Sequence, residues 1–535
     1  MCSFKATSAY DYLILGAGPA GLQLAYYLHK KRRSYLVLEA GESPGTFFKR
    51  FPRHRRLISI NKPITGVADP ETNLRWDWNS LITEKYDPSF TTYSQDYFPN
   101  ADAYVRYLCD FAQRFELKIE FQTRVTQIRR RGDFLVESQT GGLFSARRLI
   151  VATGRAQPYI PEILGIEHCE RYEDCSTNPS DYKNQRVMVI GKGNSGMETA
   201  DNLVGVTSVI HLLSPSPVRL AWKTHYVGDL RAVNNNILDT YQLKSQNTIL
   251  DARINRIEKL PDGRLRVSLK YSHADNHWDE VLVDRAIVCT GFQFDRSIFE
   301  RTTCFPQISP CGKFPMMNSQ WESTNIPDMY FAGALMHVRD YRKSFSGFIH
   351  GFRYNIRFLQ ELFEKKYEGG SLECETLALE IGEIVRFVIG RVTTASSLFQ
   401  QPAFLCDLLL LDTTKREVLC YRDIPVDYIK DDGRFANMPR LQVTLEYGHF
   451  SETVDPFSIF RYPSDGKTSA FIHPVIRYFE GHNSAAEHHI PEDLENQWDN
   501  QRYIAPFVNF LTEQLSPLLT GKRDTGIKSG ACGNF

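Results

Sequence analysis

The chain has 535 residues, of which 42% are hydrophobic, and its 63 lysine and arginine residues are balanced by 63 aspartate and glutamate residues. This length predicts several domains with large cores, and the balanced charge gives no reason to expect binding to nucleic acid or to a membrane surface. The 11 cysteines include no Cys-x-x-Cys pair, which argues against a zinc site or an adjacent redox dithiol, so no metal site is expected.

Signals for targeting or for membrane insertion are missing from the sequence pattern. No apolar leader precedes the first predicted strand, and there is no window of about 18 apolar residues. We therefore expect a soluble, cytoplasmic protein whose cysteines are reduced thiols.

Residues 13–40 predict a strand, a tight turn, a helix and a second strand, in that order. In the turn, Gly16 lets the chain bend, Gly18 lets the backbone approach a pyrophosphate, and Gly21 lets the helix pack closely on the strand. Glu39 ends the second strand, where a carboxylate accepts a hydrogen bond from a ribose 2′-hydroxyl and repels a 2′-phosphate. The pattern predicts a site for FAD or NAD rather than NADP.

A basic segment follows this first nucleotide unit. It contains Lys49, Arg50, Arg53, His54, Arg55 and Arg56. The segment is either a solvated surface loop or a set of cations that neutralises cofactor phosphates, and the sequence leaves both interpretations open. In the second interpretation Arg53 contacts the cofactor.

The next elements connect the two halves of the predicted fold. Residues 101–115 have apolar side chains at helical spacing and predict an amphipathic helix, and short alternating strands are expected around residues 118–138. Residues 147–154 form an apolar strand that ends in Thr153 and Gly154. We expect the chain to turn sharply there, beside a bound nucleotide.

A second glycine loop follows the apolar strand at residues 186–190 and leads into a helical segment. Its candidate cofactor contacts are Gly191, Gly193, Asn194, Ser195 and Gly196. The loop repeats the glycine spacing of the first unit, which predicts a second dinucleotide site. The alternative is a duplicated fold whose second site is empty.

The coenzyme of this second site follows from the end of its next strand, residues 208–213. Ser214 stands where an acid would bind a free 2′-hydroxyl, and Arg219 and Lys223 lie just beyond it. A small hydroxyl with nearby cations accommodates a 2′-phosphate, so the second site predicts NADPH.

Two later strands and a helix complete the frame. Residues 284–292 form an apolar strand that ends in Thr290 and Gly291, and residues 325–335 form a third strand that ends at Gly333. Residues 346–363 predict a helix. We expect its N-terminus, with Phe348, to face the flavin ring, where the helix dipole favours the negative charge of reduced flavin.

These elements predict an α/β fold with two Rossmann-like dinucleotide-binding domains, for FAD and NADPH, and an additional C-terminal domain. The expected boundaries are 1–175 for the first part of the FAD domain, 176–300 for the NADPH domain, 301–368 for the return segment of the FAD domain and 369–535 for an accessory domain. The accessory domain carries no motif tied to chemistry. We expect it to supply lid, substrate or oligomer contacts, which leaves a homo-oligomer open.

The two nucleotide units and the late "YFAG" resemble the two-dinucleotide-domain flavoproteins, and within them the single-component flavin monooxygenases. "LISINKP", residues 57–63, resembles the segment of that family whose asparagine lies by the flavin, which carries over to Asn61. "DRAIVCTGF", residues 284–292, resembles the strand typical of N-hydroxylating members.

A narrower resemblance covers residues 10–365 and 445–451. "FPRHRRLISINKPITG", "NLRWDWNSL" and "THYVGDLRAVNNNILDTYQLKS" are similar to FAD-dependent oxidoreductase-domain flavoproteins of the endoplasmic reticulum associated with degradation, and bacterial amino-acid N-oxygenases are similar in the same regions. Two departures matter. His168 is out of register for the F-x-G-x-x-x-H signature, and the absence of a leader or a KDEL-like tail means that an endoplasmic-reticulum role is not expected to transfer.

The resemblance implies an FAD- and NADPH-dependent monooxygenase of the single-component class. NADPH would reduce FAD, the reduced flavin would take up O2 as a C4a-hydroperoxyflavin, and one oxygen would go to a small nucleophile, with N-hydroxylation of an amine or an aspartate-like amino acid expected. Asn61 is the candidate catalytic residue, as a neutral amide that bonds to flavin, hydroperoxide or nicotinamide; its other interpretation is a turn residue before Pro63.

Two other functions remain open. The first is an NADPH-dependent flavin reductase acting on a thiol or disulfide protein partner, for which Cys169 and Cys175 are the nearest substitutes for a dithiol. The second is a redox-inactive nucleotide sensor.

The substrate is not identified by the sequence, although cations lie in segments expected near the flavin. The candidates are Arg75, His225, Arg339, Arg342 and Arg353. An arginine fork grips a carboxylate well, but each of these side chains equally suits a structural ion pair or a phosphate contact. The expected partners are a small-molecule substrate and O2.

Overall fold

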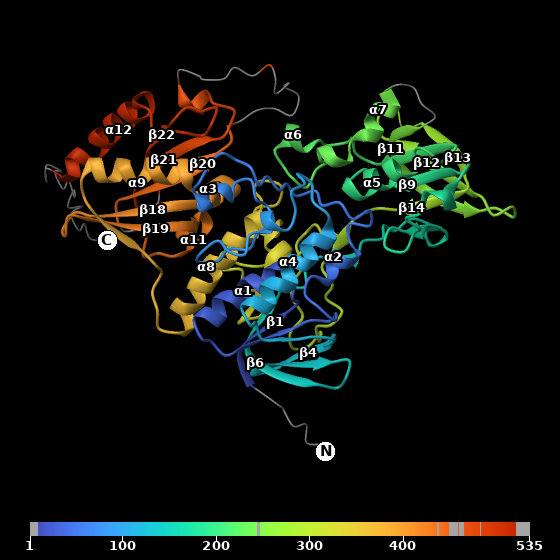
Figure 1. Ribbon diagram of the computed structural model, residues 1–535, viewed down its shortest axis with the longest axis horizontal. Helices are drawn as coiled ribbons and strands as arrows, with labels where there is room; N and C mark the ends of the chain where they lie inside the picture. The colour runs from blue at the N-terminus through green and yellow to red at the C-terminus, as the bar shows by residue number, and fades with distance from the viewer. Residues whose placement is uncertain are drawn as a thin grey trace, which may run out of the picture. The chain divides into compact units, whose positions relative to one another are not determined.

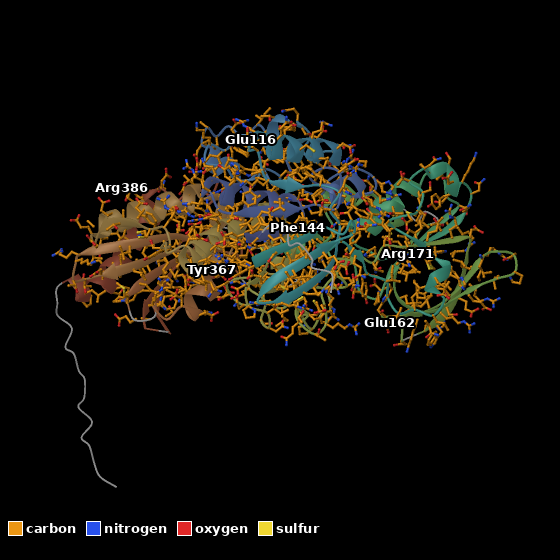
Figure 2. All side chains as sticks on the ribbon, turned by 90° about the horizontal axis from the view of Figure 1, so that it is seen from below. Glu116, Phe144, Glu162, Arg171, Tyr367 and Arg386 are labelled. Carbon is orange, nitrogen blue, oxygen red and sulfur yellow. The ribbon has the colours of Figure 1, made fainter. Side chains whose placement is uncertain are left out.

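The computed structural model describes residues 9–242, 247–275, 277–435, 438–448, 458, 465–481 and 483–519. The chain divides into two compact units, residues 1–363 and 364–535, which are called unit 1 and unit 2 here (Figure 1). In Figure 2, Glu116 and Glu162 lie on the outside of unit 1, whereas Phe144 is buried within it.

The first sheet of unit 1 has seven strands in the order β3-β2-β1-β6-β5-β4, with β16 paired to β6. Its strands are β1 (Ala9–Leu15), β2 (Tyr35–Leu38), β3 (Ile119–Glu120), β4 (Val125–Arg131), β5 (Asp133–Ser138), β6 (Leu143–Val151) and β16 (Met329–Phe331). β1, β2, β3, β6 and β16 run parallel, and β4 and β5 join them as an antiparallel meander. β2 is apolar and buried along its whole length, and β1 and β6 are apolar and buried over their last residues, Tyr12 to Leu15 and Leu149 to Val151.

The helices of this part of unit 1 are α1 (Pro19–Lys30), α2 (Thr46–Arg50), α3 (Pro70–Asn73), α4 (Ala101–Arg114) and α8 (Ile349–Tyr367). Phe363 of α8 lies against Tyr12 and Tyr330, with ring centroids 5.2 and 4.8 Å apart. Because Tyr12 and Tyr330 come from β1 and β16, these aromatic contacts fix the helix across strands that are far apart in the chain.

The second sheet has the order β13-β12-β11-β10-β9-β14-β8. Figure 1 labels five of its strands, β9, β11, β12, β13 and β14. Its strands are β8 (Glu170–Arg171), β9 (Arg186–Ile190), β10 (Val209–Ser214), β11 (Thr248–Lys259), β12 (Leu265–Tyr271), β13 (Trp278–Val283) and β14 (Arg285–Val288). The helices beside it are α5 (Asn194–Leu203), α6 (Ala221–Thr224) and α7 (Asn236–Gln242). A separate pair, β7 (Gln157–Pro158) and β15 (Phe292–Gln293), joins the two crossovers between the sheets.

Unit 2 is built on a six-stranded antiparallel sheet in the order β17-β19-β18-β20-β21-β22. Its strands are β17 (Glu375–Ala378), β18 (Leu405–Asp412), β19 (Glu417–Pro425), β20 (Arg440–Glu446), β21 (His473–Glu480) and β22 (Asn483–His489), and its helices are α9 (Ile381–Thr394), α10 (Ser396–Gln400), α11 (Val426–Asp431) and α12 (Gln501–Leu519). Arg391 on α9 pairs with Asp407 at 2.6 Å and Asp423 at 2.7 Å, which satisfies two carboxylates buried on the sheet.

The predicted α/β class with two Rossmann-like units is confirmed, and the expected elements differ mainly at their ends. The helix predicted from residue 346 begins at Ile349, because the Ser346 N–H donates to Asp340 Oδ2 at 3.0 Å instead of entering the helix. The strand predicted at 284–292 divides into β14 and β15, and Ser214 is the last residue of β10. Of the similar segment 445–451, residues 449–451 lie outside the described residues.

Candidate functional site

The first glycine loop has an open middle position. Gly16 has a φ of +100°, and a Cβ there would lie 2.9 Å from the carbonyl oxygen of Ala152; a Cβ on Gly21 would lie 1.9 Å from that of Gly16. A Cβ on Gly18 would meet no atom within 4 Å. Gly18 also caps α1 without a side-chain hydrogen bond to the helix N–H groups. The fold therefore requires Gly16 and Gly21, and Gly18 leaves space where a pyrophosphate fits the N-terminus of α1.

The second glycine loop repeats this arrangement. A Cβ on Gly191 would lie 2.3 Å from the carbonyl oxygen of Cys289, and one on Gly196 would lie 1.9 Å from that of Gly191. Gly193 again has no atom within 4 Å of the added Cβ and caps α5 without a side-chain bond. Ser195 lies in the first turn of α5, where its carbonyl oxygen accepts a hydrogen bond from Thr199. The residues present fit a second dinucleotide.

Glu39 is buried at the end of β2 and binds its own loop. Its Oε2 accepts from the N–H of Ala17 at 2.7 Å, and its Oε1 accepts from the N–H of Gly41 at 2.8 Å and from the hydroxyl of Thr46 at 3.0 Å. A carboxylate has about four acceptor sites, so capacity for a ribose hydroxyl remains. Glu39 therefore also fixes the shape of the glycine loop.

The predicted turn residues lie where strands end beside these loops. Thr153 and Gly154 follow β6, and the Thr290 hydroxyl, just before Gly291, donates to the carbonyl oxygen of Tyr159. Gly333 follows β16, and a Cβ there would lie 2.6 Å from that of Ala20 in α1. The absence of a side chain at Gly333 thus lets the return segment approach the first glycine loop.

Asn61 is fully buried, and its donor and acceptor atoms differ in their environment. Its Nδ2 donates to the carbonyl oxygens of Ser94 at 2.8 Å and Asp96 at 3.3 Å. Its Oδ1 has no hydrogen-bond partner among the described residues. The amide group is thus held in place with one acceptor unsatisfied, a costly state unless a ligand or a rearrangement supplies a donor.

A second buried polar group lies close by, at the start of α8. The ring of His350 stacks on Trp78 with centroids 4.2 Å apart, and the N–H of Trp78 bonds to the carbonyl oxygen of Ile60, next to Asn61. Neither ring nitrogen of His350 has a partner within the described part of the chain. Burial lowers the pKa of His350 well below its usual value, so the imidazole is neutral.

Phe348 and Arg231 extend this cluster. The ring of Phe348, a predicted flavin contact, lies 5.9 Å from that of His350. The guanidinium of Arg231 lies 4.9 Å from the centroid of Trp78. The segments at residues 57–63, 74–80 and 348–353 therefore meet in unit 1. The sequence analysis did not identify His350, Trp78 or Arg231, because no short motif marks them.

A hydrogen-bonded series of side chains joins the two nucleotide-binding parts of unit 1. The Tyr226 hydroxyl lies 2.8 Å from Nε2 of His337, and Nδ1 of His337 lies 3.1 Å from Oδ1 of Asp340. Asp340 Oδ2 accepts from the Ser346 N–H. Burial raises the pKa of the Tyr226 phenol, so the hydroxyl keeps its proton. Because the carboxylate orients the imidazole toward the phenol, the series has the geometry of a proton relay, and we name it the Tyr226 relay.

Two of the candidate substrate cations are buried inside unit 1. Arg353 is completely buried, and it donates to the carbonyl oxygens of Asp77 at 2.9 Å, Ser80 at 2.8 Å and Leu74 at 2.8 Å. Arg75 is also buried, at 2% exposure. The bonds of Arg353 hold the 74–80 segment against α8, which agrees with the structural interpretation that the sequence left open for it. A substrate contact by Arg75 stays a prediction.

The remaining substrate candidates lie near the Tyr226 relay. Arg342 pairs with Asp229 at 2.5 Å and lies over the ring of Tyr226, and the guanidinium of Arg339 lies 4.4 Å from the centroid of Trp321. His225 is half-buried, and burial lowers its pKa. The structure thus brings Arg342 and His225 beside the relay but places Arg339 on an aromatic side chain.

The predicted NADPH contacts have mixed environments. Ser214 donates to the carbonyl oxygen of Ser216 at 3.0 Å, and Arg219 Nε lies 3.9 Å from Asp229. The side chain of Asn194 holds a neighbouring loop, since its Nδ2 donates to the carbonyl oxygen of Asp229 at 3.0 Å and its Oδ1 accepts from the N–H of Arg231 at 3.0 Å. The structure therefore gives Asn194 a loop-positioning role whether or not it contacts a cofactor.

The predicted phosphate contact Arg53 joins two segments of unit 1. It donates from Nη2 to the carbonyl oxygen of Cys175 at 2.7 Å, and its N–H donates to the hydroxyl of Tyr172 at 3.0 Å. Tyr172 in turn donates to the buried carboxyl group of Glu198 on α5. Arg53 therefore helps to connect the first nucleotide-binding part to the second.

The nine described cysteines form no disulfide with one another. Burial raises the pKa of Cys169 to about 12 and also raises that of Cys175, which keeps both as thiols rather than thiolates. Within the described ranges, no group of three or more His, Cys, Asp or Glu side chains is arranged to hold a metal ion. None of the helices in those ranges combines the length and apolar character that a bilayer crossing requires.

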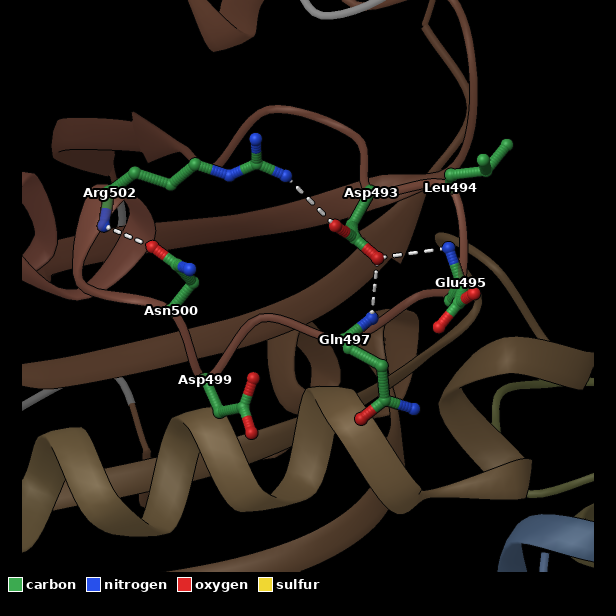
Figure 3. A pocket seen from close by; sticks show the side chains of 7 residues that line it. All are labelled: Asp493, Leu494, Glu495, Gln497, Asp499, Asn500 and Arg502. Atoms are coloured by element: carbon green, nitrogen blue, oxygen red, sulfur yellow. Dashed lines mark hydrogen bonds and ion pairs between the residues drawn. The ribbon is translucent and has the colours of Figure 1, made fainter.

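A polar cavity lies in unit 2, lined by Asp493, Leu494, Glu495, Gln497, Asp499, Asn500 and Arg502 (Figure 3). Asp493 accepts from the N–H groups of Glu495 and Gln497, each at 2.9 Å, and from Arg502 at 3.1 Å. The loop thus satisfies its own polar groups, and none of the predicted cofactor or substrate residues lines this cavity.

Comparison with known proteins agrees with this geometry. A model of the pyridine nucleotide-disulphide oxidoreductase family matches residues 13–333. The chain is 37% identical to FAD-dependent oxidoreductase domain-containing protein 2 of Mus musculus, over 94% of this chain and 83% of the mouse protein.

Two solved structures have a similar fold. A flavin-containing monooxygenase from Stenotrophomonas maltophilia has a TM-score of 0.53 and 20% identity, covering 67% of this chain and 99% of that chain. An ornithine N-hydroxylase of Kutzneria sp. 744 has a TM-score of 0.50 and 16% identity, covering 67% of this chain and 100% of that chain. These findings confirm the resemblance to two-dinucleotide flavoproteins and the expected class of oxidoreductase. The chain belongs to the pyridine nucleotide-disulphide oxidoreductase family.

Proposed function

We propose that this oxidoreductase is a monooxygenase that binds FAD at the Gly16 loop and NADPH at the Gly191 loop. It uses O2 to oxygenate a small nucleophile, the nitrogen of an amine or amino acid. The observation that carries the proposal is the pair of glycine loops, each with two glycines required by packing and a middle glycine beside open space. The similarity to the mouse flavoprotein and the shared fold of the N-hydroxylase support the same reaction class.

The proposed reaction consumes one NADPH, one proton, one O2 and one amine, and it produces NADP+, water and the N-hydroxylated amine. The bound flavin would supply the transfer of two electrons and the activation of O2. This chain's residues would orient the two cofactors, exclude water and control proton transfer. The Tyr226 relay lies on the loop of the NADPH-binding part and the return segment, so it is suited to hold a proton beside the reacting groups.

Asn61 remains the candidate catalytic residue in this proposal. Its unsatisfied Oδ1 would accept a hydrogen bond from flavin or nicotinamide after a small side-chain adjustment. The neutral His350 nearby adds no proton at neutral pH, because burial keeps its pKa low. A site with neutral polar groups favours oxygen transfer over the premature release of hydrogen peroxide.

The test is an oxygen-consumption screen of the holoenzyme with NADPH over amines and amino acids. For a substrate, we expect the consumed O2 to appear as N-hydroxylated product rather than as hydrogen peroxide. Anaerobic NADPH should bleach the flavin absorbance, which separates an enzyme from a redox-inactive sensor. Stoichiometric peroxide with every amine, together with reduction of a protein disulfide, would favour the reductase instead. The raised pKa values of Cys169 and Cys175 give that alternative no support.

A further inference from the structure

We propose that Arg155 and Lys313 form an oxyanion-binding subsite of unit 1, and that its ligand is the carboxylate of the substrate. The identity of the ligand as a substrate rests on the proposed function, whereas the subsite itself rests on the two cations. Arg155 directly follows Gly154 at the turn after β6, and Lys313 precedes Phe314 in a later loop. Neither residue was a candidate in the sequence analysis.

The two cations are placed by a group of aromatic rings. The guanidinium of Arg155 lies 5.1 Å from the centroid of Phe314, and the ammonium of Lys313 lies 5.2 Å from that of Tyr159. Both residues are partly buried, and neither forms an ion pair or a side-chain hydrogen bond with any residue in the described part of the chain. Buried cations are usually paired, so these two lack a normal partner.

The groups that face the cations carry no compensating charge. The titratable groups near Arg155 are Tyr226, Tyr341 and Cys311, and those near Lys313 are Arg155 and Cys311. Burial lowers the pKa of both cations, and for Lys313 the charge of Arg155 lowers it further. Holding two like charges close together in a partly buried site is unfavourable, and an oxyanion bound between them would reduce that cost.

The position of the subsite favours a substrate group. The Phe314 ring that supports Arg155 lies 5.9 Å from His337 and 5.6 Å from Tyr341. His337 belongs to the Tyr226 relay, so the ring that lies under Arg155 also lies beside the relay. Both open middle glycines, Gly18 and Gly193, lie instead at helix N-termini, which already suit the cofactor pyrophosphates. The Arg155 and Lys313 pair is therefore left for another anion.

The experiment compares anion binding with coenzyme binding in the holoenzyme, by titration calorimetry with succinate and, separately, with NADP+. For Arg155→Gln combined with Lys313→Gln, we expect at least a tenfold loss of succinate affinity and unchanged NADP+ affinity. Arg155→Lys keeps a cation and should retain most of the succinate affinity. The control is Lys270→Gln, which removes a cation that lies over Trp278 in the antiparallel strands of the second sheet.

Each other outcome overturns the proposal. Parallel loss of NADP+ affinity would assign the cations to a coenzyme phosphate, and unchanged succinate affinity would remove the subsite. A second measurement does not need a ligand: Lys313→Gln should raise the unfolding temperature in buffer free of multivalent anions, because it removes a like-charge contact. A lower temperature there would contradict the unpaired-cation argument. Because these readouts need no turnover, the subsite survives if oxygenation is never observed, and the proposed function survives if the subsite fails.

Discussion

The Tyr226 hydroxyl lies 2.8 Å from Nε2 of His337 and thereby joins the loop after β10 to the segment after β16 in unit 1. The two rings are nearly parallel, with an interplanar angle of 3°. Arg342 and Asp229 form an ion pair across the same two segments. The relative placement of the two segments therefore depends on polar contacts that can be altered one at a time.

Tyr226→Phe should weaken this connection while keeping the ring contacts. We expect the free energy of unfolding to fall by about 0.5–1.5 kcal/mol, because the change removes one hydrogen bond and leaves a buried imidazole nitrogen unpaired. Tyr27→Phe is the matched control, since the Tyr27 hydroxyl is buried without a partner among the described residues. Urea unfolding of both variants checks this, and an equal loss in both would mean that the Tyr226 bond contributes nothing.

Gly18→Ala and Gly193→Ala should separate the two cofactor sites. Both added methyl groups meet open space, so the proteins should fold, but each methyl group would enter the expected path of a pyrophosphate. We expect Gly18→Ala to lower FAD affinity at least about tenfold, since one lost charge-assisted hydrogen bond amounts to about 1.5–3 kcal/mol. Gly193→Ala should keep FAD and raise the KM for NADPH. Flavin content and steady-state kinetics are the measurements. Gly205→Ala is the control, because its added methyl group also meets open space but lies outside both loops. Equal loss of flavin in Gly18→Ala and Gly193→Ala would contradict the assignment of FAD to the first loop and NADPH to the second.

Arg219→Ala should reduce the preference for NADPH. The side chain is 40% exposed and lies 3.9 Å from Asp229, which leaves its guanidinium able to reach a 2′-phosphate. We expect the KM for NADPH to rise about tenfold while the KM for NADH changes little, because NADH lacks that phosphate. Arg264→Ala, which removes an exposed arginine paired with Asp262, is the control. If both coenzymes lose equally, Arg219 has a structural role instead.

Asn61→Ala should separate flavin reduction from oxygen transfer. Reduction of the flavin by NADPH without oxygen should persist. The yield of oxygenated product should fall about ten- to hundredfold, with hydrogen peroxide in its place, because the variant loses about 1–3 kcal/mol of hydrogen bonding. Asn79→Ala is the control, because Asn79 is also fully buried but both ends of its amide have partners. Its Oδ1 accepts from the Ser59 hydroxyl, and its Nδ2 donates to the carbonyl oxygen of Ile60. Product and peroxide are measured together, and the same uncoupling in both variants would reduce Asn61 to a scaffold residue.

Glu198 should make stability depend on pH. Burial raises its pKa to about 7, against about 4.3 for an unfolded glutamate. The folded protein binds this proton more tightly, so the stability that it contributes is fully present below pH 4.3 and is lost as the pH rises through 7. The free energy of unfolding of Glu198→Gln, measured relative to that of the wild type, should therefore rise by up to about 3 kcal/mol from pH 4.5 to pH 7.5, given about 1.36 kcal/mol for each pKa unit. Urea unfolding across this range is the measurement, with exposed Glu162→Gln as a control expected to show no such trend.

The sequence predicted the two glycine loops well because their signal is local. A strand, three glycines and a helix occupy about 20 residues, and the packing of Gly21 and Gly196 on their own loops follows from that spacing. The same local signal placed Glu39 at the end of β2. Its three bonds to its own loop were not predicted, because the path of residues 40–46 is set by the tertiary fold.

The rest of the site depends on contacts between residues that are far apart in the chain. The strands β11 to β16 lie between Tyr226 and His337 in the chain, so no short sequence pattern pairs the two residues. The sequence likewise could not distinguish Arg353, whose guanidinium binds carbonyl oxygens inside the fold, from Arg155, whose guanidinium has no such partner. Both residues are arginines, and only the path of the backbone around each one determines whether its guanidinium meets carbonyl oxygens.

The pairing of β16 with β6 has a consequence for the order in which the protein is made. Val151 leaves the ribosome early, but its partner Phe331 is synthesised only after the whole second sheet. β5 already pairs with the first half of that edge of β6, so only the end of the strand, Leu149 to Val151, must wait for its neighbour. The second sheet is contiguous from β8 to β14 and meets no such delay. During synthesis, the part that is encoded second is therefore the part that is able to finish folding first.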